Sequence, residues 1–242
     1  MTRNDRSTGG RDAESRVVLT LVLDHYVGVA EGMESLRLLT TTPGVVMVVW
    51  SALTTIAPAL RDRFAMAVGG CSFAEELPNS PETLRDYQGV YVPIASNGLV
   101  YALSEGDDRD PVVRTLLLAT FLGIPAAILG MGWDPNTDSW VKAGLGRAST
   151  VWPDAWRMRS QRLRHLGMDV LRTPDMVTNW AGQALEGPRV LDAAMVEVRH
   201  HQGQREVSVG TRTIVTPGAH DRLRQYGMTL RTSGEKTWRL DE

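Results

Sequence analysis

The sequence has a single cysteine, Cys71. One thiol excludes an internal disulfide and indicates a reducing, cytoplasmic setting. Long apolar runs are also missing, because no stretch approaches the roughly 20 residues of a membrane-spanning helix. The formal net charge is −2, and without a basic face nothing predicts contact with nucleic acid. We therefore expect neither a membrane nor a nucleic acid as a partner.

The first residues, 1–15, lack the apolar core of a secretory signal. They are polar and contain glycine, which is typical of a disordered tail. We expect the folded part of the chain to begin near Arg16.

Apolar runs alternate with helical patterns between residues 16 and 140. Runs rich in β-branched residues are typical of strands that are covered on both faces. Strand, helix and strand in turn predict a flavodoxin/Rossmann-like α/β domain with a doubly wound parallel sheet. The predicted strands are 17–23, 43–50, 89–95 and 124–130, with helices at 29–39, 52–68 and 110–123.

Residues 141–242 show a different pattern, and we interpret them as a C-terminal α+β extension. A loop rich in Gly, Trp and Asp leads to a basic amphipathic helix over 154–168. A strand, a helix and a strand are predicted near the end, over 207–215, 216–226 and 228–232. No internal repeat is evident in the sequence.

The turn after the first predicted strand, "LDHYVG" (23–28), is a candidate ligand site. Phosphate-binding turns need small residues, so that backbone N–H groups reach the anion at a helix N-terminus. Gly28 is present, but His25 and Tyr26 are bulky and no G-x-G-x-x-G motif occurs. The turn is either a ligand contact or a surface turn without anion affinity.

Polar residues also follow the next two strands. Ser51 can cap the following helix or bind a phosphate. Asn97 offers both a donor and an acceptor, and Gly98 permits a positive φ. Ser96–Gly98 is thus either a ligand contact or a structural turn.

Met131 and Trp133 follow the fourth strand, where they either lie on a flat ring or pack in the interior. The acids of 104–110 lack the spacing of a metal loop, and Asp110 fits a helix N-cap better. His200–His201 has no third ligand nearby, so we expect no metal site.

Several stretches together resemble the flavoprotein family that includes phosphopantothenoylcysteine decarboxylase. They are "YVPIASNGLVYALSEG" (91–106), "ATFLGIPAAILG" (119–130) and "TIVTPGAHDRLRQYGM" (213–228). The last two make the chain more similar still to the branch of the family that is associated with bacterial microcompartments. The likeness covers most of 16–136 and 207–232.

This resemblance implies an FMN site and an assembly of three or more copies of the chain. It also implies a location in the cytoplasm or in the lumen of a bacterial microcompartment. In a microcompartment, the partners would be the enzymes or the shell proteins of that compartment. Ser51 matches the serine that commonly contacts the FMN phosphate, and Pro93 and Asn97 match in spacing. His25, Tyr26, Gly28, Ser96, Gly98, Met131 and Trp133 would complete the cofactor site.

The family's decarboxylases have a histidine after the third strand, and this chain has none between His25 and His165. Decarboxylation of a cysteine-containing substrate is therefore not expected. Three functions stay open. The protein is an accessory flavin reductase or electron carrier, a non-catalytic scaffold that kept the fold, or another small-ligand enzyme on the same fold.

Overall fold

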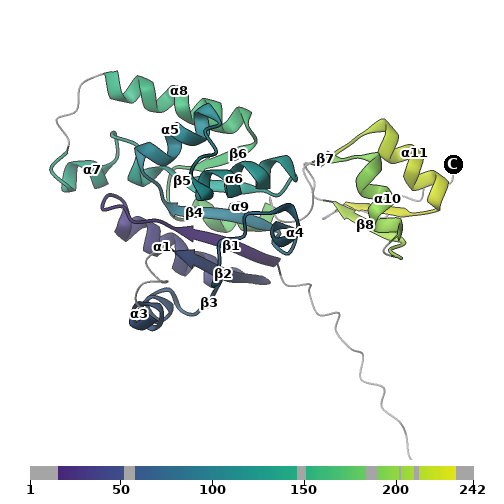
Figure 1. Cartoon of the computed structure of the whole chain (residues 1–242), viewed down its shortest axis with the longest axis horizontal. Helices are drawn as coiled ribbons and strands as arrows, with labels where there is room; N and C mark the ends of the chain where they lie inside the picture. Colours follow the sequence, from purple (N-terminus) through teal and green to yellow (C-terminus); the bar gives the residue numbers. More distant parts are fainter. Residues whose placement is uncertain are drawn as a thin grey trace, which may run out of the picture.

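The computed structural model describes residues 16–51, 58–145, 151–183, 190–201, 203–209 and 213–232. The predicted tail at 1–15 lies outside the described residues. The main body is built on a six-stranded parallel sheet in the order β3-β2-β1-β4-β5-β6 (Figure 1). Its strands are Arg16–Val22 (β1), Val45–Ser51 (β2), Ser72–Phe73 (β3), Gly89–Ile94 (β4), Ala126–Leu129 (β5) and Met168–Leu171 (β6).

The strand order is that of the doubly wound Rossmann class. β1 lies in the interior of the sheet and pairs in parallel with β2 on one side and β4 on the other. The order reverses at this point, because the chain proceeds outward from β1 through β2 and β3, then returns to β4 on the other side. The predicted fold class is confirmed.

Side chains of β1 alternate between two cores, as the two-residue period of a strand requires. Leu19 and Leu21 belong to one core, and Val18 and Val22 to the other. The helices sort to the two faces accordingly (Figure 1). The first face is covered by Pro81–Leu84 (α4), Asn97–Glu105 (α5), Pro111–Phe121 (α6) and Val151–His165 (α8), the second by Val29–Thr40 (α1), Pro58–Val68 (α3) and Met176–Gln183 (α9).

A buried hydrogen-bonded chain joins β4 to α1. The Tyr91 hydroxyl donates to Ser35 Oγ at 2.7 Å, and Ser35 Oγ donates to the Gly32 carbonyl oxygen at 2.7 Å. A Cβ at Gly32 would lie 2.5 Å from Cγ1 of Ile94, so glycine allows the helix to approach the strand closely. Tyr91 is fully buried, and this burial raises the pKa of its phenol.

β6 comes from the stretch that the sequence analysis placed in the C-terminal extension. It pairs in parallel with β5, and α8 packs against it. The sheet therefore reaches beyond the boundary that we expected near Trp140. No described helix is both long and apolar enough to cross a bilayer.

The C-terminal part has a hydrophobic core of its own. Two small parallel sheets, β7 with β9 and β8 with β10, pack with two helices (Figure 1). The elements are Val190–Leu191 (β7), Ala193–His201 (α10), Glu206–Val209 (β8), Ile214–Val215 (β9), Pro217–Tyr226 (α11) and Thr229–Thr232 (β10). The predicted strand over 207–215 is thus two strands, with 210–212 outside the described residues.

These elements form two similar strand–helix–strand units, so the expectation of no internal repeat is wrong. Asp192 and Thr216 each cap a helix by accepting the N–H three residues on, at 2.8 and 3.2 Å. Gly203 and Gly227 end the two helices with φ of 78° and 60°. Equivalent strands pair with each other, β7 with β9 and β8 with β10. The two units share their helix caps and the pairing of their equivalent strands, rather than the identity of their core side chains.

Candidate functional site

The loops after β1, β4 and β5 meet at the carboxyl edge of the sheet. This edge at a reversal of strand order is where open α/β sheets bind ligands. The 3-10 turn Gly130–Gly132 (η1) follows β5 and contacts both α1 and β4. The contacts of Gly132 show how closely the three loops approach.

Two glycines allow this meeting of backbones. A Cβ at Gly132 would lie 2.6 Å from the carbonyl oxygen of Ala95 and 3.0 Å from that of Val27. A Cβ at Gly28 would lie 2.8 Å from the Gly132 nitrogen, and Gly28 has a φ of 76°. Gly28 was among the predicted residues, whereas Gly132 was missed because its role depends on a contact distant in sequence.

A hydrogen bond from His25 joins the loop after β1 to the loop after β5. The Nε2 of this histidine lies 2.9 Å from the Gly132 carbonyl oxygen. A carbonyl oxygen only accepts, so Nε2 donates the hydrogen of this bond. The neighbouring Tyr26 is 74% exposed, and its ring centroid lies 4.9 Å from that of His25. Tyr26 is therefore open to a ligand or a partner.

The turn after β4 begins α5. Ser96 is the N-cap, and its Oγ accepts from the Leu99 N–H at 3.2 Å. Asn97 and Gly98 form the first turn of this helix. A Cβ at Gly98 would meet only Ser96 Oγ, at 3.7 Å, so the backbone here faces open space.

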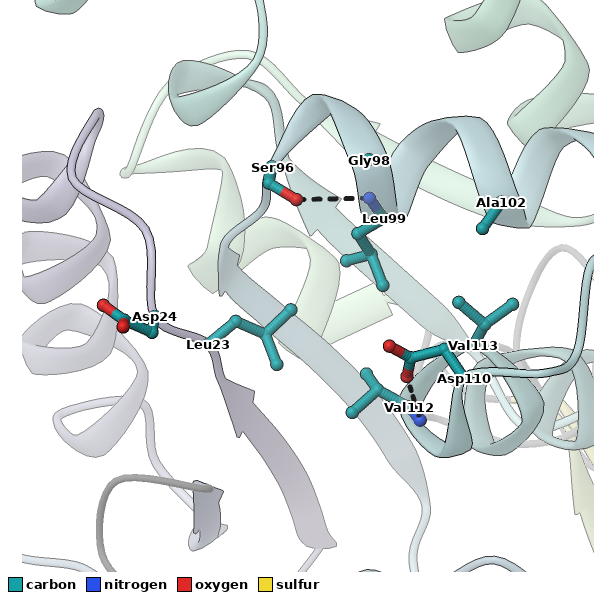
Figure 2. Close-up of a pocket in the computed structure, with 9 residues that line it drawn as sticks. All are labelled: Leu23, Asp24, Ser96, Gly98, Leu99, Ala102, Asp110, Val112 and Val113. Carbon is teal, nitrogen blue, oxygen red and sulfur yellow. Dashed lines mark hydrogen bonds between the residues drawn. The ribbon is translucent and has the colours of Figure 1, made fainter.

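A groove of about 280 Å³ lies between the end of β1 and the first turns of α5 and α6 (Figure 2). This volume is near the lower end of the range for small-molecule sites. Its lining is about equally polar and apolar, and Ser96 and Gly98 are among the predicted residues that line it. The lining residues are Leu23, Asp24, Ser96, Gly98, Leu99, Ala102, Asp110, Val112 and Val113.

The structure separates the remaining predicted residues from this groove. Ser51 ends β2 and is 2% exposed, and residues 52–57, which follow it, lie outside the described residues. Met131 packs against the core on the α1 face, and Trp133 is fully buried in the opposite core. The Trp133 ring lies 5.5 Å from that of Trp156. Of the two alternatives for Trp133, packing in the interior is the one observed, because neither face of a fully buried indole is open to a ligand.

The loop after β5 is also tied to α1. Ser139, in the short helix Asp138–Lys142 (α7), donates from Oγ to Oε1 of Glu31 at 2.6 Å. Thr137 Oγ1 donates to the Asp134 carbonyl oxygen at 2.9 Å. These bonds hold the loop beside the first turn of α1.

Leu99, Ala102, Val112 and Val113 were missed as lining residues. Apolar side chains in the first turns of helices have the same pattern whether they line a groove or the core, so the sequence contained no separate signal. Asp110 was predicted as the N-cap of α6, and its Oδ1 accepts from the Val112 N–H at 2.7 Å.

The charges of the groove determine how well it suits FMN. Asp24 and Asp110 line it, and no lysine or arginine is among its lining residues. The apolar part of the lining suits a flat ring, whereas a phosphate would be repelled by these carboxylates. The residues thus fit the ring of FMN better than its phosphate. A bound phosphate would have to lie away from these two carboxylates.

Groups outside this edge show no metal site. Among the described residues, no three His, Cys, Asp or Glu side chains are placed to bind a metal ion. His200 instead stacks on Tyr226, with ring centroids 4.1 Å apart. Cys71 is half-buried, and burial raises the pKa of its thiol to about 11, so it is a weak nucleophile.

No protein-family model matches the chain, and no curated protein matches it. Several solved structures are similar to it in part. AnUbiX (PadA1), in complex with FMN and dimethylallyl pyrophosphate, is 10% identical, with 72% of this chain and 94% of that chain covered and a TM-score of 0.47. DmrB from Burkholderia xenovorans, a cubic protein cage for redox transfer, is 14% identical, with 70% and 94% covered and a TM-score of 0.46.

MrsD from Bacillus sp. HIL-Y85/54728 is also 14% identical, with 71% and 97% covered and a TM-score of 0.46. At these levels of identity and overlap the similarity carries no conclusion about the activity of this chain. What these proteins bind or assemble into is a property of theirs.

Proposed function

We propose that this protein binds FMN at the carboxyl edge of its sheet and acts as an accessory flavin reductase or electron carrier. The observation that supports it best is the meeting of the loops after β1, β4 and β5 at Gly132, beside a groove at the reversal of strand order. The strand-end motifs that resemble flavoproteins supply the choice of FMN.

In this proposal the residues have separate tasks. Gly28 and Ser51 lie near the phosphate, and Asn97 lies near the ring or the ribityl chain. His25 and Tyr26 lie at the rim, and the Nε2–H of His25 fixes the loop on Gly132. When bound, the isoalloxazine supplies the redox chemistry, while the protein orients it and excludes water.

Titration of FMN into flavin-free protein, followed by quenching of flavin fluorescence, tests the proposal. We expect saturable binding, and Gly132→Ala should weaken it about tenfold, because even small displacements in a preorganised site are costly. Gly182→Ala is the matched control, since a Cβ at Gly182 meets nothing within 4 Å. An absence of saturable binding by wild-type protein would refute the proposal.

A non-catalytic assembly role is the second candidate, and the C-terminal repeat favours it. Residues 190–232 have a separate core, so we propose that they form a module of their own, with the flavin-type domain ending between Gln183 and Val190. The likeness of 213–228 to segments of microcompartment-associated proteins makes a microcompartment the proposed location. Co-purification with shell proteins, lost when 190–242 are deleted, is the expected result.

We also propose a homo-oligomer. Tyr26, Val29 and Val141 are 74%, 41% and 63% exposed, and the Glu31–Ser139 bond joins the two helices that contain Val29 and Val141. Exposed apolar residues on neighbouring elements are typical of an interface. Light scattering should give a mass of three or more chains, and Val141→Asp should lower it.

A further inference from the structure

The groove between α5 and α6 has an amphipathic lining (Figure 2). Leu23 enters from the end of β1 and Leu99 from α5, while Val112 and Val113 come from α6 (Figure 2). Leu99, Val112 and Val113 are only 8%, 6% and 1% exposed, whereas Leu23 and Ala102 are half-buried. Leu23 and Ala102 therefore offer the accessible apolar surface for a small hydrocarbon body.

Asp110 is the acid that faces this space. One carboxyl oxygen accepts from the Val112 N–H at 2.7 Å, and the other is turned toward the space between Leu23 and Leu99 (Figure 2). The carboxylate of Asp24 points away from the other lining side chains (Figure 2). Of the two acids that line the groove, Asp110 alone therefore borders the apolar surface.

The nearby arginines do not neutralise this carboxylate. Arg109 forms an ion pair with Asp107 at 2.5 Å. Arg114 donates to the carbonyl oxygen of Asp108 at 3.1 Å. Neither arginine lines the groove, so the charge of Asp110 is left for a ligand.

We propose that the groove binds a small primary amine with an apolar body. The ammonium donates to the outward oxygen of Asp110, and the hydrocarbon packs on Leu23 and Ala102. Charge-assisted hydrogen bonds are stronger than neutral ones, so the carboxylate selects cations over neutral or anionic molecules of the same shape. This site goes beyond the proposed flavin function and does not require it.

Three probes of matched size test the inference by calorimetry on flavin-free, full-length protein: phenethylamine, 2-phenylethanol and 3-phenylpropionate. We expect the amine to bind at least about tenfold more tightly than the alcohol and the carboxylate to bind weakest. Equal affinity for amine and alcohol, or tighter binding of the carboxylate, would overturn the proposal.

Asp110→Asn is the informative variant, because Asn is as good an N-cap as Asp and the helix should remain intact. It should remove the preference for the amine, whereas Asp108→Asn, with the same change of charge outside the groove, should keep it. Ala102→Phe should fill the groove and weaken all three probes. An amine preference that survives Asp110→Asn would contradict the assignment.

The result of the amine test can be distinguished from the result of the FMN test. Both affinities are measured on the wild-type protein, that for the amine by calorimetry and that for FMN by quenching of flavin fluorescence. Amine binding without FMN binding would support the groove alone. FMN binding without amine binding would support the flavin site alone.

Discussion

The Nε2 of His25 lies 2.9 Å from the carbonyl oxygen of Gly132. This bond joins a loop near the start of the chain to one that follows β5. Next to it, the backbones of Val27, Ala95 and Gly132 are too close for a side chain at Gly132. The loops at this edge of the sheet therefore meet through backbone atoms and have little room to adjust.

Gly132→Ala should destabilise the protein. Its Cβ would lie 2.6 Å from the Ala95 carbonyl oxygen, and overpacking of this kind typically costs about 1–3 kcal/mol. Urea denaturation followed by circular dichroism measures the loss. Gly182→Ala should leave stability within about 0.5 kcal/mol of wild type. Unchanged stability of Gly132→Ala would mean that the loops are further apart than described.

Tyr91→Phe should remove the buried bond to Ser35 and lower the free energy of unfolding by about 1 kcal/mol. Burial raises the pKa of Tyr91, so above about pH 10 the unfolded chain loses this proton first. Stability should then fall as the pH rises, and Tyr91→Phe should make that fall less steep. Tyr101→Phe, at a 53% exposed position, should change neither quantity.

Cys71 should react slowly with a thiol reagent. Burial raises the pKa of this thiol to about 11, which leaves about 100-fold less thiolate at neutral pH than an exposed cysteine with a pKa near 9.0 has. Because it is the only cysteine, the absorbance of released thionitrobenzoate reports on it alone. Reaction should become fast in urea. A fast reaction of the folded protein would show that the thiol is accessible.

The two halves of the C-terminal repeat should respond alike to loss of their caps. Asp192→Ala and Thr216→Ala each remove an N-cap, at a typical cost of about 1 kcal/mol. Hydrogen exchange should show faster opening of α10 and α11 together in either variant, since they share one core. Asp192→Asn should be nearly neutral. Opening confined to one helix would contradict a shared core.

The sequence was sufficient to predict the first strands and the fold class, because apolar runs such as 17–23 and 89–95 have few other interpretations. β6 was missed because it is four residues long, includes Asp169, and follows a basic helix directly. The repeat was missed because its two halves share caps and glycines rather than core residues.

At the site, sequence identified the turns but not their contacts. His25 and Gly28 were chosen as ligand residues, and the structure shows that both also hold the loop against Gly132. Trp133 was expected either to lie on a flat ring or to pack in the interior, and it fills the core beside Trp156. A tryptophan after a strand has the same pattern in either location, so only tertiary packing decides between them.

The most direct test is to map FMN onto the protein by the amide chemical shifts of isotopically labelled, flavin-free protein. The account predicts that FMN shifts amides of 23–28, 96–98 and 130–133, and leaves those of 190–232 unchanged. Shifts confined to other parts of the chain, or no shifts at saturating FMN, would contradict a flavin site at this edge of the sheet.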